Sequence, residues 1–180
     1  EFAGYWEYLL EKAIFTVPPH PTYGGAALIG PDGRLVGIGS LVVSDAIPAL
    51  RPVPGNMFVP IDRLKPIMAE LLEKGRVSAP RHPWLGVYSN EKDGRVFVTR
   101  VAADGPADVA GIKPGDIIMG VAGKRIKNIA DFYRKIWARG EAGTEVPIDL
   151  LPAGGGEIKI VKVTVSSQDR YDWLKLNRGL

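Results

Sequence analysis

Short apolar runs separated by glycine- and proline-rich turns fill the second half of the chain. Alternating and β-branched runs predict strands at 84–88, 95–101, 117–121, 145–151 and 157–165. Apolar residues at helical spacing predict a short helix at 106–110 and a longer one at 129–138. Turns at 113–116 and 154–156 separate these elements. About 85 residues of short strands and two helices are typical of a small α+β module.

The first half shows a hairpin pattern followed by a helix. Two apolar runs, at 26–30 and 34–43, flank Pro31-Asp32-Gly33, a combination that favours a tight turn with a positive-φ residue. A proline-rich connection is expected over 44–56, then a short strand at 57–60. A helix is predicted over 62–74. Its apolar residues recur at helical spacing and are expected to face a core: Leu64, Ile67, Met68, Leu71 and Leu72.

A change in composition near residue 77 indicates a boundary between two parts. Residues 1–77 contain seven Lys or Arg and eight Asp or Glu, a net charge of −1, whereas the remainder contains sixteen and twelve, a net charge of +4. The segment 75–83 contains a glycine and two prolines, which end a helix and oppose its continuation. We therefore assign 1–77 to one part, 78–83 to a linker, 84–167 to the second module and 168–180 to a tail, as a short helix or a frayed end.

Composition narrows the possible chemistry. The 180 residues are 46% hydrophobic and 24% charged and include no cysteine, which is ordinary globular composition without disulfides, thiol nucleophiles or thiolate metal sites. Since His20 and His82 are the only histidines, we expect no metal site and no cofactor. The net charge of +3 is spread along the chain, which argues against nucleic-acid binding.

Neither a membrane span nor a leader is predicted. No apolar run reaches the roughly 20 residues needed to cross a bilayer. The first residues lack the basic region and the cleavage site of a signal peptide. Either the protein is not exported, or this sequence is an internal fragment of a longer one.

One set of motifs in the second part is specific enough to indicate a type of domain. Trp84-Leu85-Gly86-Val87 is followed by Gly105-Pro106-Ala107-Asp108-Val109-Ala110-Gly111-Ile112-Lys113-Pro114-Gly115-Asp116, and then by Val121-Ala122-Gly123-Lys124-Arg125-Ile126. Over residues 82–167 this pattern resembles a PDZ domain of the bacterial protease-associated type. The resemblance implies that a peptide adds a strand beside the one that follows the Leu-Gly-Val loop. Glycine lets consecutive N–H groups of that loop converge on a carboxylate.

The resemblance also implies individual peptide-binding residues. On the loop and the strand after it they are Leu85, Gly86, Val87, Tyr88 and Ser89, and on the helix at 129–138 they are Phe132, Tyr133 and Ile136. An alternative for the three helix residues is that they fill the core of a small module. Arg81 and His82 either help to attract a carboxylate or are solvated residues of the linker.

The first part resembles the end of the chymotrypsin-like protease domain of the HtrA family. In that family the catalytic serine lies in Gly-Asn-Ser-Gly-Gly-Pro-Leu, followed by a strand, an Asp-Gly turn and a second strand. This chain has Pro21-Thr22-Tyr23-Gly24-Gly25-Ala26-Ala27-Leu28, then Pro31-Asp32-Gly33 and an apolar run to Ser40, with matching spacing and flanks. The fold class implied is mainly β with an α+β module: a partial chymotrypsin-like β-barrel segment followed by a PDZ domain.

The chemistry of this segment departs from the family's pattern. Tyr23 stands at the serine position, flanked by Gly24 and Gly25, and a phenol with a pKa of about 10 cannot replace a small hydroxyl nucleophile. Pro21 stands at the glycine that would supply an oxyanion-hole N–H, and proline has none. The family's triad histidine and aspartate precede this segment and lie outside the chain. We interpret His20 as a loop residue and assign no catalytic residue.

These observations predict an HtrA-like serine protease homologue without catalytic activity, whose PDZ domain binds protein C-termini or unfolded peptide segments. One alternative is a fragment of an active periplasmic serine endopeptidase of protein quality control, and another is a regulatory subunit that holds a catalytic homologue. An incomplete barrel would expose apolar faces and strand edges, so we expect a homo-oligomer or association with the missing protease-domain segment. The resemblance implies a periplasmic or cell-envelope location.

Overall fold

The computed structural model describes residues 1–47, 51–78, 80–154 and 160–174. Contacts within the chain divide it into two compact units. The first comprises Glu1–Phe2 and Leu10–Ala79, and the second comprises Ala3–Leu9 and Pro80–Leu180. The division falls inside the seam at 75–83, but the short stretch Ala3–Leu9 belongs to the second unit although its position in the chain suggests the first.

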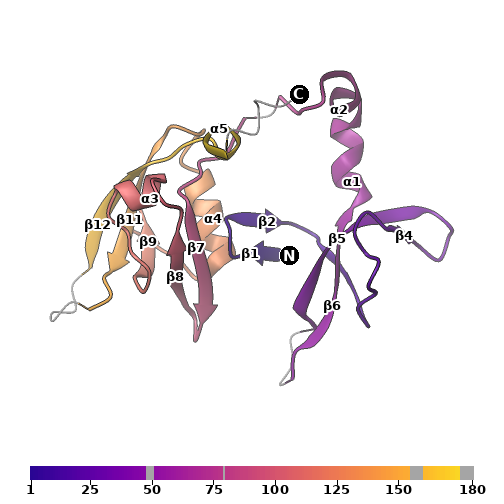
Figure 1. The fold of residues 1–180 in the computed structure, drawn as a ribbon, viewed down its shortest axis with the longest axis horizontal. Coiled ribbons are helices and arrows are strands. Elements are labelled where there is room, and N and C mark those ends of the chain that lie inside the picture. Colours follow the sequence, from indigo (N-terminus) through magenta and orange to yellow (C-terminus); the bar gives the residue numbers. More distant parts are fainter. Residues whose placement is uncertain (48–50, 79, 155–159, 175–180) are drawn as a thin grey trace. The chain divides into compact units, whose positions relative to one another are not determined.

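The first unit contains a four-stranded antiparallel sheet (Figure 1). Its strands are β3 (Ile14–Thr16), β4 (Ala27–Ile29), β5 (Leu35–Ile47) and β6 (Val53–Pro60), in the order β3-β6-β5-β4. The predicted hairpin is confirmed, because β4 pairs with β5 across a turn in which Gly33 has a φ of 76°. Glycine adopts this left-handed conformation without a Cβ penalty.

Within the described residues, the connection expected over 44–56 is mostly strand; residues 48–50 lie outside the described part. β5 continues to Ile47 and β6 begins at Val53, with Val43 opposite Gly55. On its other side, β6 pairs with β3 through residues 56–58, so Pro54 lies beyond the part of β6 that pairs with β3. A proline, which lacks an N–H donor, is tolerated where a strand has such a free edge.

The predicted helix over 62–74 is interrupted at Pro66. α1 (Ile61–Leu64) leads into a 3-10 turn at Lys65–Ile67, and α2 (Met68–Lys74) follows, because proline lacks a helical N–H and crowds the preceding turn. The expectation that the apolar stripe faces a core is wrong for Met68 and Leu72, which are 39% and 83% exposed. α1 packs against β5 and β6, whereas α2 extends away from this sheet (Figure 1).

The second unit is built on an antiparallel sheet that has β7 at one edge. Its strands are β7 (Val87–Lys92), β8 (Arg95–Val101), β9 (Ile117–Val121), β10 (Lys124–Arg125), β11 (Glu145–Leu151) and β12 (Val161–Ser166). The order is β12-β11-β9-β8-β7, with β10 paired to β9. The helices are α3 (Pro106–Val109), α4 (Ile129–Trp137) and α5 (Arg170–Leu174). Strands β1 (Phe2–Gly4) and β2 (Tyr8–Leu10) form a separate two-stranded sheet.

The elements predicted for this module are confirmed with differences at their ends. The strand expected at 84–88 begins at Val87, because Gly86 has a φ of 79° and interrupts the extended backbone. Trp84 instead forms an isolated bridge with Gln168. Of the strand expected at 157–165, residues 157–159 lie outside the described part, and β12 begins at Val161. The tail forms α5, and residues 175–180 lie outside the described part.

α4 packs on the sheet and closes the core of the second unit. Asn128 caps the helix, because its side-chain oxygen accepts a hydrogen bond from the backbone N–H of Asp131 at 2.7 Å. The helix side chains Phe132, Tyr133 and Ile136 are each 0% exposed and belong to the hydrophobic core. The amphipathic pattern that predicted this helix is therefore the pattern of its buried face.

Candidate functional site

In the loop Leu85-Gly86-Val87, the carbonyl groups of Leu85 and Gly86 accept backbone hydrogen bonds, whereas the N–H groups of Leu85 and Val87 donate to a side chain. Leu85 O accepts a hydrogen bond from Ala107 N, and Gly86 O accepts one from Ala102 N, both at 2.8 Å. A Cβ on Gly86 would lie 3.2 Å from the Cβ of Ala102 and 3.3 Å from the Trp84 ring, at a φ of 79°. This backbone conformation therefore requires glycine. Converging backbone N–H groups of this kind form an anion-binding nest.

A carboxylate of the same unit occupies this nest. Glu7 Oε2 accepts a hydrogen bond from Leu85 N at 2.9 Å, and Glu7 Oε1 accepts one from Val87 N at 2.7 Å. Glu7 is 8% exposed. Burial raises the pKa of Glu7 to about 7, although the N–H groups of the loop and the positive charge of Arg170 act in the opposite direction. The nest thus holds both oxygens of one carboxylate.

The buried phenol of Tyr133 ties residues 3–9, which form the N-terminal turn, to α4. Its hydroxyl donates a hydrogen bond to Gly4 O at 2.7 Å and accepts one from Glu7 N at 3.1 Å. Ser89 Oγ on β7 lies 3.3 Å from the same hydroxyl. Burial raises the pKa of Tyr133 to about 12, so the hydroxyl keeps its proton at neutral pH and remains a donor. One hydroxyl therefore bridges both ends of the turn and faces the edge strand.

The backbone of the turn also reaches β7. Ser89 N donates a hydrogen bond to Tyr5 O at 2.9 Å. Val87 N donates to the Glu7 side chain, and Ser89 N, two residues later on β7, donates to the backbone of Tyr5, two residues before Glu7. The turn therefore meets Ser89 through the Tyr5 backbone and Val87 through the Glu7 side chain, which places the carboxylate at the loop end of β7. A peptide that adds to an edge strand through its backbone uses the same N–H groups.

The remaining predicted residues differ in their surroundings. The side chains of Leu85, Val87, Phe132 and Ile136 lie in the hydrophobic core, so the first two reach the carboxylate through their backbone. Tyr88 is half-buried, with the Arg100 guanidinium 3.7 Å from the centre of its ring and the Tyr5 ring 6.5 Å away. The structure therefore brings the loop, Tyr88 and Tyr133 together around the turn and places Phe132 and Ile136 in the core.

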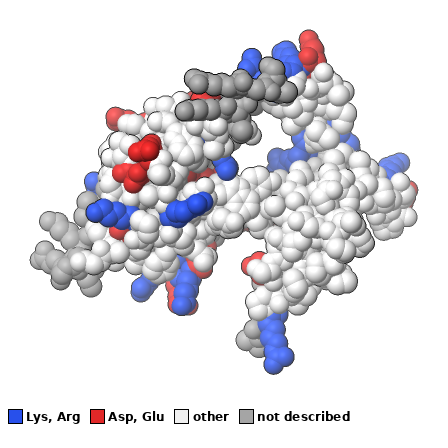
Figure 2. Space-filling view, viewed as in Figure 1, with Lys and Arg blue, Asp and Glu red and all other residues white. Residues whose placement is uncertain are grey.

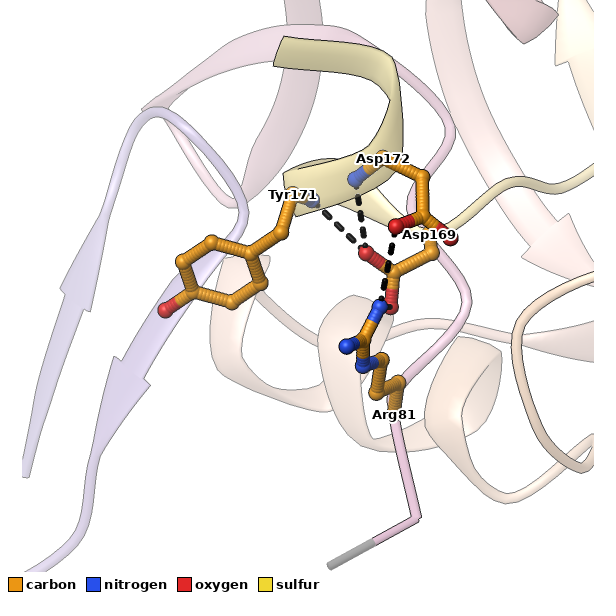
Figure 3. Close-up of polar contacts among 4 residues, drawn as sticks. All are labelled: Arg81, Asp169, Tyr171 and Asp172. Carbon is orange, nitrogen blue, oxygen red and sulfur yellow. Dashed lines mark hydrogen bonds and ion pairs between the residues drawn. The ribbon is translucent and has the colours of Figure 1, made fainter. Parts of the chain in front are cut away.

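Arg81 and His82 make contacts away from the loop. The Arg81 guanidinium lies 3.1 Å from Asp169 Oδ2 and 3.1 Å from Asp172 Oδ1 (Figure 3). Asp169 Oδ1 accepts hydrogen bonds from the backbone N–H groups of Tyr171 and Asp172 at 2.8 and 3.0 Å, so this carboxylate also caps α5. The His82 ring stacks on Trp137 with centroids 4.5 Å apart. Arg81 thus anchors α5, and His82 packs on α4.

The segment that resembles the protease nucleophile loop forms a turn before β4. Tyr23 O accepts a hydrogen bond from Ala26 N at 2.9 Å, and Tyr23 lies so close to Gly39 that a Cβ at residue 39 would clash with its carbonyl. His20 N donates to Oδ1 of the buried Asn56 at 2.6 Å. His20 Nδ1 accepts a hydrogen bond from Thr22 N at 3.2 Å. The His20 ring therefore accepts a hydrogen bond from within its own turn.

Sequence reasoning does not find the residues that fill the nest and support its occupant. Glu7 fills the nest; Gly4, Tyr5 and Arg170 hold the turn that carries it, Arg170 through a hydrogen bond of 3.4 Å from its guanidinium to Trp6 O. Glu7 and Leu85 are 78 positions apart, and no local pattern reports a contact over that separation. The run Tyr5-Trp6-Glu7-Tyr8, with one acid among three aromatic residues, is the local feature that could have drawn attention.

Comparison with known proteins gives this site a family context. Residues 83–165 match the PDZ domain family. Serine protease Do-like HtrA of Bacillus subtilis is 29% identical over 161 residues, which cover 80% of this chain and 35% of the relative. That alignment is longer than the PDZ match and therefore reaches into the first unit. The chain is a relative of the HtrA/DegP-like serine proteases.

Other relatives agree with this placement. A probable periplasmic serine endoprotease, DegP-like, of Buchnera aphidicola is 27% identical over 161 residues, covering 82% of this chain and 33% of the relative. The HtrA-type protease AlgW, solved with a decapeptide, has a TM-score of 0.50 and 24% identity over 80% of this chain and 45% of that one, and supports the mainly β fold. This HtrA-related chain spans about a third of the length of these two curated relatives.

Three further observations concern the described residues of this HtrA relative. On the face drawn in Figure 2, Lys and Arg side chains are scattered among Asp and Glu and do not form one patch. Within the described ranges, no helix has the length and apolar character required to cross a membrane. The same residues contain no group of three or more His, Cys, Asp or Glu side chains placed to hold a metal ion.

Proposed function

We propose that this chain is an HtrA-like homologue without catalytic activity, and that its PDZ domain binds C-terminal or extended peptide segments of other proteins. The observation that carries the proposal is the Glu7 carboxylate, held by Leu85 N at 2.9 Å and Val87 N at 2.7 Å. A terminal carboxylate presents the same two oxygens to the same two donors. Hydrogen bonds to a charged acceptor are among the stronger ones in proteins.

The edge strand β7 supports the proposed backbone pairing with an extended peptide. Ser89 N on β7 donates to a backbone carbonyl, that of Tyr5, at 2.9 Å. Backbone pairing of this kind is independent of the ligand's side chains, so affinity comes from the strand and the carboxylate loop. Tyr88 and Tyr133 would then contact the peptide beside that strand, as the resemblance to PDZ domains implies.

A matched pair of peptides tests this proposal. One labelled peptide is prepared with a free C-terminal acid and again as the C-terminal amide, and both are titrated into the full chain. Each charge-assisted hydrogen bond contributes about 1.5–3 kcal/mol, so we expect the acid to bind at least roughly tenfold more tightly. Equal affinities of the acid and the amide would contradict carboxylate recognition by the loop.

The proposed absence of catalysis rests on the first unit. A serine nucleophile is missing from the segment that resembles the protease loop: Tyr23 stands at the matched position, and no serine occurs before Ser40, so a small shift in the alignment does not restore one. Pro21 lacks the N–H that would contribute to an oxyanion hole. We expect a fluorophosphonate probe to leave the protein unlabelled.

A second candidate, a serine endopeptidase of protein quality control, is favoured by the similarity to HtrA of Bacillus subtilis. This chain covers 35% of that relative. Stoichiometric labelling of the full-length natural protein by the same probe, on a serine mapped by mass spectrometry, would favour the endopeptidase. A periplasmic or cell-envelope location accords with the printed name of the Buchnera relative and is tested by fractionation of the source cells.

The first unit supports an association with further protein. Exposed apolar side chains lie on its strands: Ile29 is 55% exposed, Val42 is 50% exposed and Ile47 is 45% exposed. Apolar strand surfaces of this kind favour pairing with another chain or segment. We propose that a second copy or further protease-domain sequence covers them. Sedimentation over a hundredfold concentration range tests self-association, and a constant monomer would exclude it.

A further inference from the structure

We propose that residues 3–9 are a built-in ligand of the PDZ domain, in which the Glu7 side chain takes the place of a partner's terminal carboxylate and must leave before a partner peptide binds. This inference rests on the proposed function of the Leu85-Gly86-Val87 loop as a carboxylate site. It goes beyond that function, because it assigns the resting occupant of the site to the chain's own N-terminal turn.

The turn and an external peptide would need the same donors. Leu85 N and Val87 N both donate to Glu7, and Ser89 N donates to Tyr5 O. Each backbone N–H has one hydrogen to give. A peptide that ends at the loop and pairs with β7 therefore cannot bind while the turn remains in place. Both occupants place a carboxylate at the loop end of β7.

The turn adopts a conformation that the chain would not choose without these contacts. The chain continues past Glu7 into β2, so no backbone terminus is present at the loop and the side chain supplies the carboxylate. Glu7 has a φ of 58°. A non-glycine residue in this left-handed region is strained, and such a conformation persists where surrounding contacts determine it.

Further contacts hold the turn on both sides of Glu7. Ala3 and Leu9 pack against the hydrophobic core of the PDZ domain. The Tyr133 hydroxyl bonds to Gly4 O and Glu7 N. The Arg170 guanidinium donates to Trp6 O and adds a positive charge near the Glu7 carboxylate. Residues 3–9 are therefore held in the site by backbone hydrogen bonds, by the Glu7 carboxyl group and by the apolar contacts of Ala3 and Leu9.

Because the turn is covalently joined to the PDZ domain, it competes strongly with an external peptide. A ligand joined to its site through a short linker has an effective concentration in the millimolar range. External peptides then bind only the open fraction, and their apparent affinity falls by that fraction. When the open form makes up roughly 0.1–10% of the protein, removal of the occupant raises peptide affinity about 10- to 1,000-fold.

The decisive comparison uses Glu7→Gln, which keeps the side-chain shape but turns an NH2 donor towards a backbone N–H donor, whereas the carboxyl group offers one acceptor oxygen each to Leu85 N and Val87 N. Its matched control is Glu73→Gln, an exposed position on α2. The labelled acid and amide peptides are titrated into the full chain of the wild type and of both variants. We expect Glu7→Gln to bind the acid at least roughly tenfold more tightly than the wild type does, and Glu73→Gln to match the wild type.

The outcomes separate this inference from the proposed function. If the acid is preferred over the amide but the wild type and Glu7→Gln bind it equally, the loop is a carboxylate site and the built-in ligand is refuted. If the wild type and both variants bind the acid and the amide peptide equally, the proposed function fails. Deuterium uptake of residues 3–9 then tests separately whether the turn is docked. Slow uptake in the wild type and in Glu73→Gln with faster uptake in Glu7→Gln supports a docked turn. Equally fast uptake in all three overturns it.

Discussion

Glu7 Oε1 and the backbone nitrogen of Val87 lie 2.7 Å apart although 80 positions separate the two residues. This hydrogen bond joins the start of the chain to the PDZ loop and places a carboxylate where the loop can hold one. It explains two properties together: the loop is shaped for a carboxylate, and a side chain of the same molecule already uses it.

Seating of the N-terminal turn should weaken as pH rises. The docked Glu7 has a pKa of about 7, and the released side chain has the ordinary value of about 4.5. Below about pH 4.5 the Glu7 carboxyl group is protonated in both the docked and the released form. Between about pH 4.5 and 7 it is protonated mainly in the docked form. Docking is therefore most favourable below about pH 4.5, weakens up to roughly 300-fold towards pH 7, and is constant above it.

Deuterium uptake of residues 3–9 at pH 5 and pH 8, corrected for the intrinsic exchange rates, checks this dependence. We expect more opening at pH 8 in the wild type and no pH effect in Glu7→Gln. The loop N–H groups, Arg170 and Tyr133 also face Glu7; the pKa of Tyr133, raised to about 12 by burial, leaves its hydroxyl neutral throughout this range. More opening at pH 5 would contradict the prediction.

Gly86→Ala should damage the loop itself. The added Cβ would lie 3.2 Å from Ala102 Cβ and would hold a non-glycine residue at a φ of 79°, so we expect a loss of about 2–3 kcal/mol in unfolding free energy and loss of the acid-over-amide preference. Gly94→Ala is the matched control, because Gly94 has a φ of 68° with open space around a Cβ. It should cost about 1 kcal/mol and leave the acid-to-amide affinity ratio unchanged.

Tyr133→Phe should loosen the turn while it preserves the core. The buried ring remains, but Gly4 O and Glu7 N lose their shared partner, and an unpaired buried polar group costs about 1–3 kcal/mol. Deuterium uptake of residues 3–9 should accelerate roughly 5- to 150-fold. Tyr171→Phe, at a ring 58% exposed on α5, should leave uptake unchanged. If both variants behave alike, the hydroxyl does not hold the turn.

Arg81→Ala separates the two interpretations of this residue. Because the Arg81 guanidinium is exposed and its pairs with Asp169 and Asp172 are screened by solvent, we expect only a small change in unfolding free energy. The affinity for the acid peptide should stay within roughly twofold of the wild type. A large loss of affinity for the acid, with the amide unchanged, would show that Arg81 attracts the ligand carboxylate after all.

The features predictable from sequence are those encoded locally. The hairpin around Gly33 and the buried face of α4 follow from turn chemistry and helical spacing, and both are present. Gly86 stands out because an anion nest needs a residue without a side chain. The motifs around it led to the PDZ resemblance, which residues 83–165 bear out.

Features that depend on distant partners escaped prediction. The length of β5 and β6 comes from their mutual pairing, which a proline-rich sequence conceals. The exposure of Leu72 depends on what lies opposite its helix rather than on the periodicity within it. Glu7 escaped for the same reason: a buried acid is recognisable only when its donors are known, and here they are 78 and 80 positions away.

The most direct test of the account is to follow the Leu85 and Val87 amides by NMR hydrogen exchange. We predict slow exchange at both amides in the wild type, faster exchange in Glu7→Gln, and slow exchange restored in that variant by an excess of the acid peptide but not of its amide. Amides that exchange at the same rate in the wild type and Glu7→Gln, and that do not respond to the acid peptide, would contradict the carboxylate site.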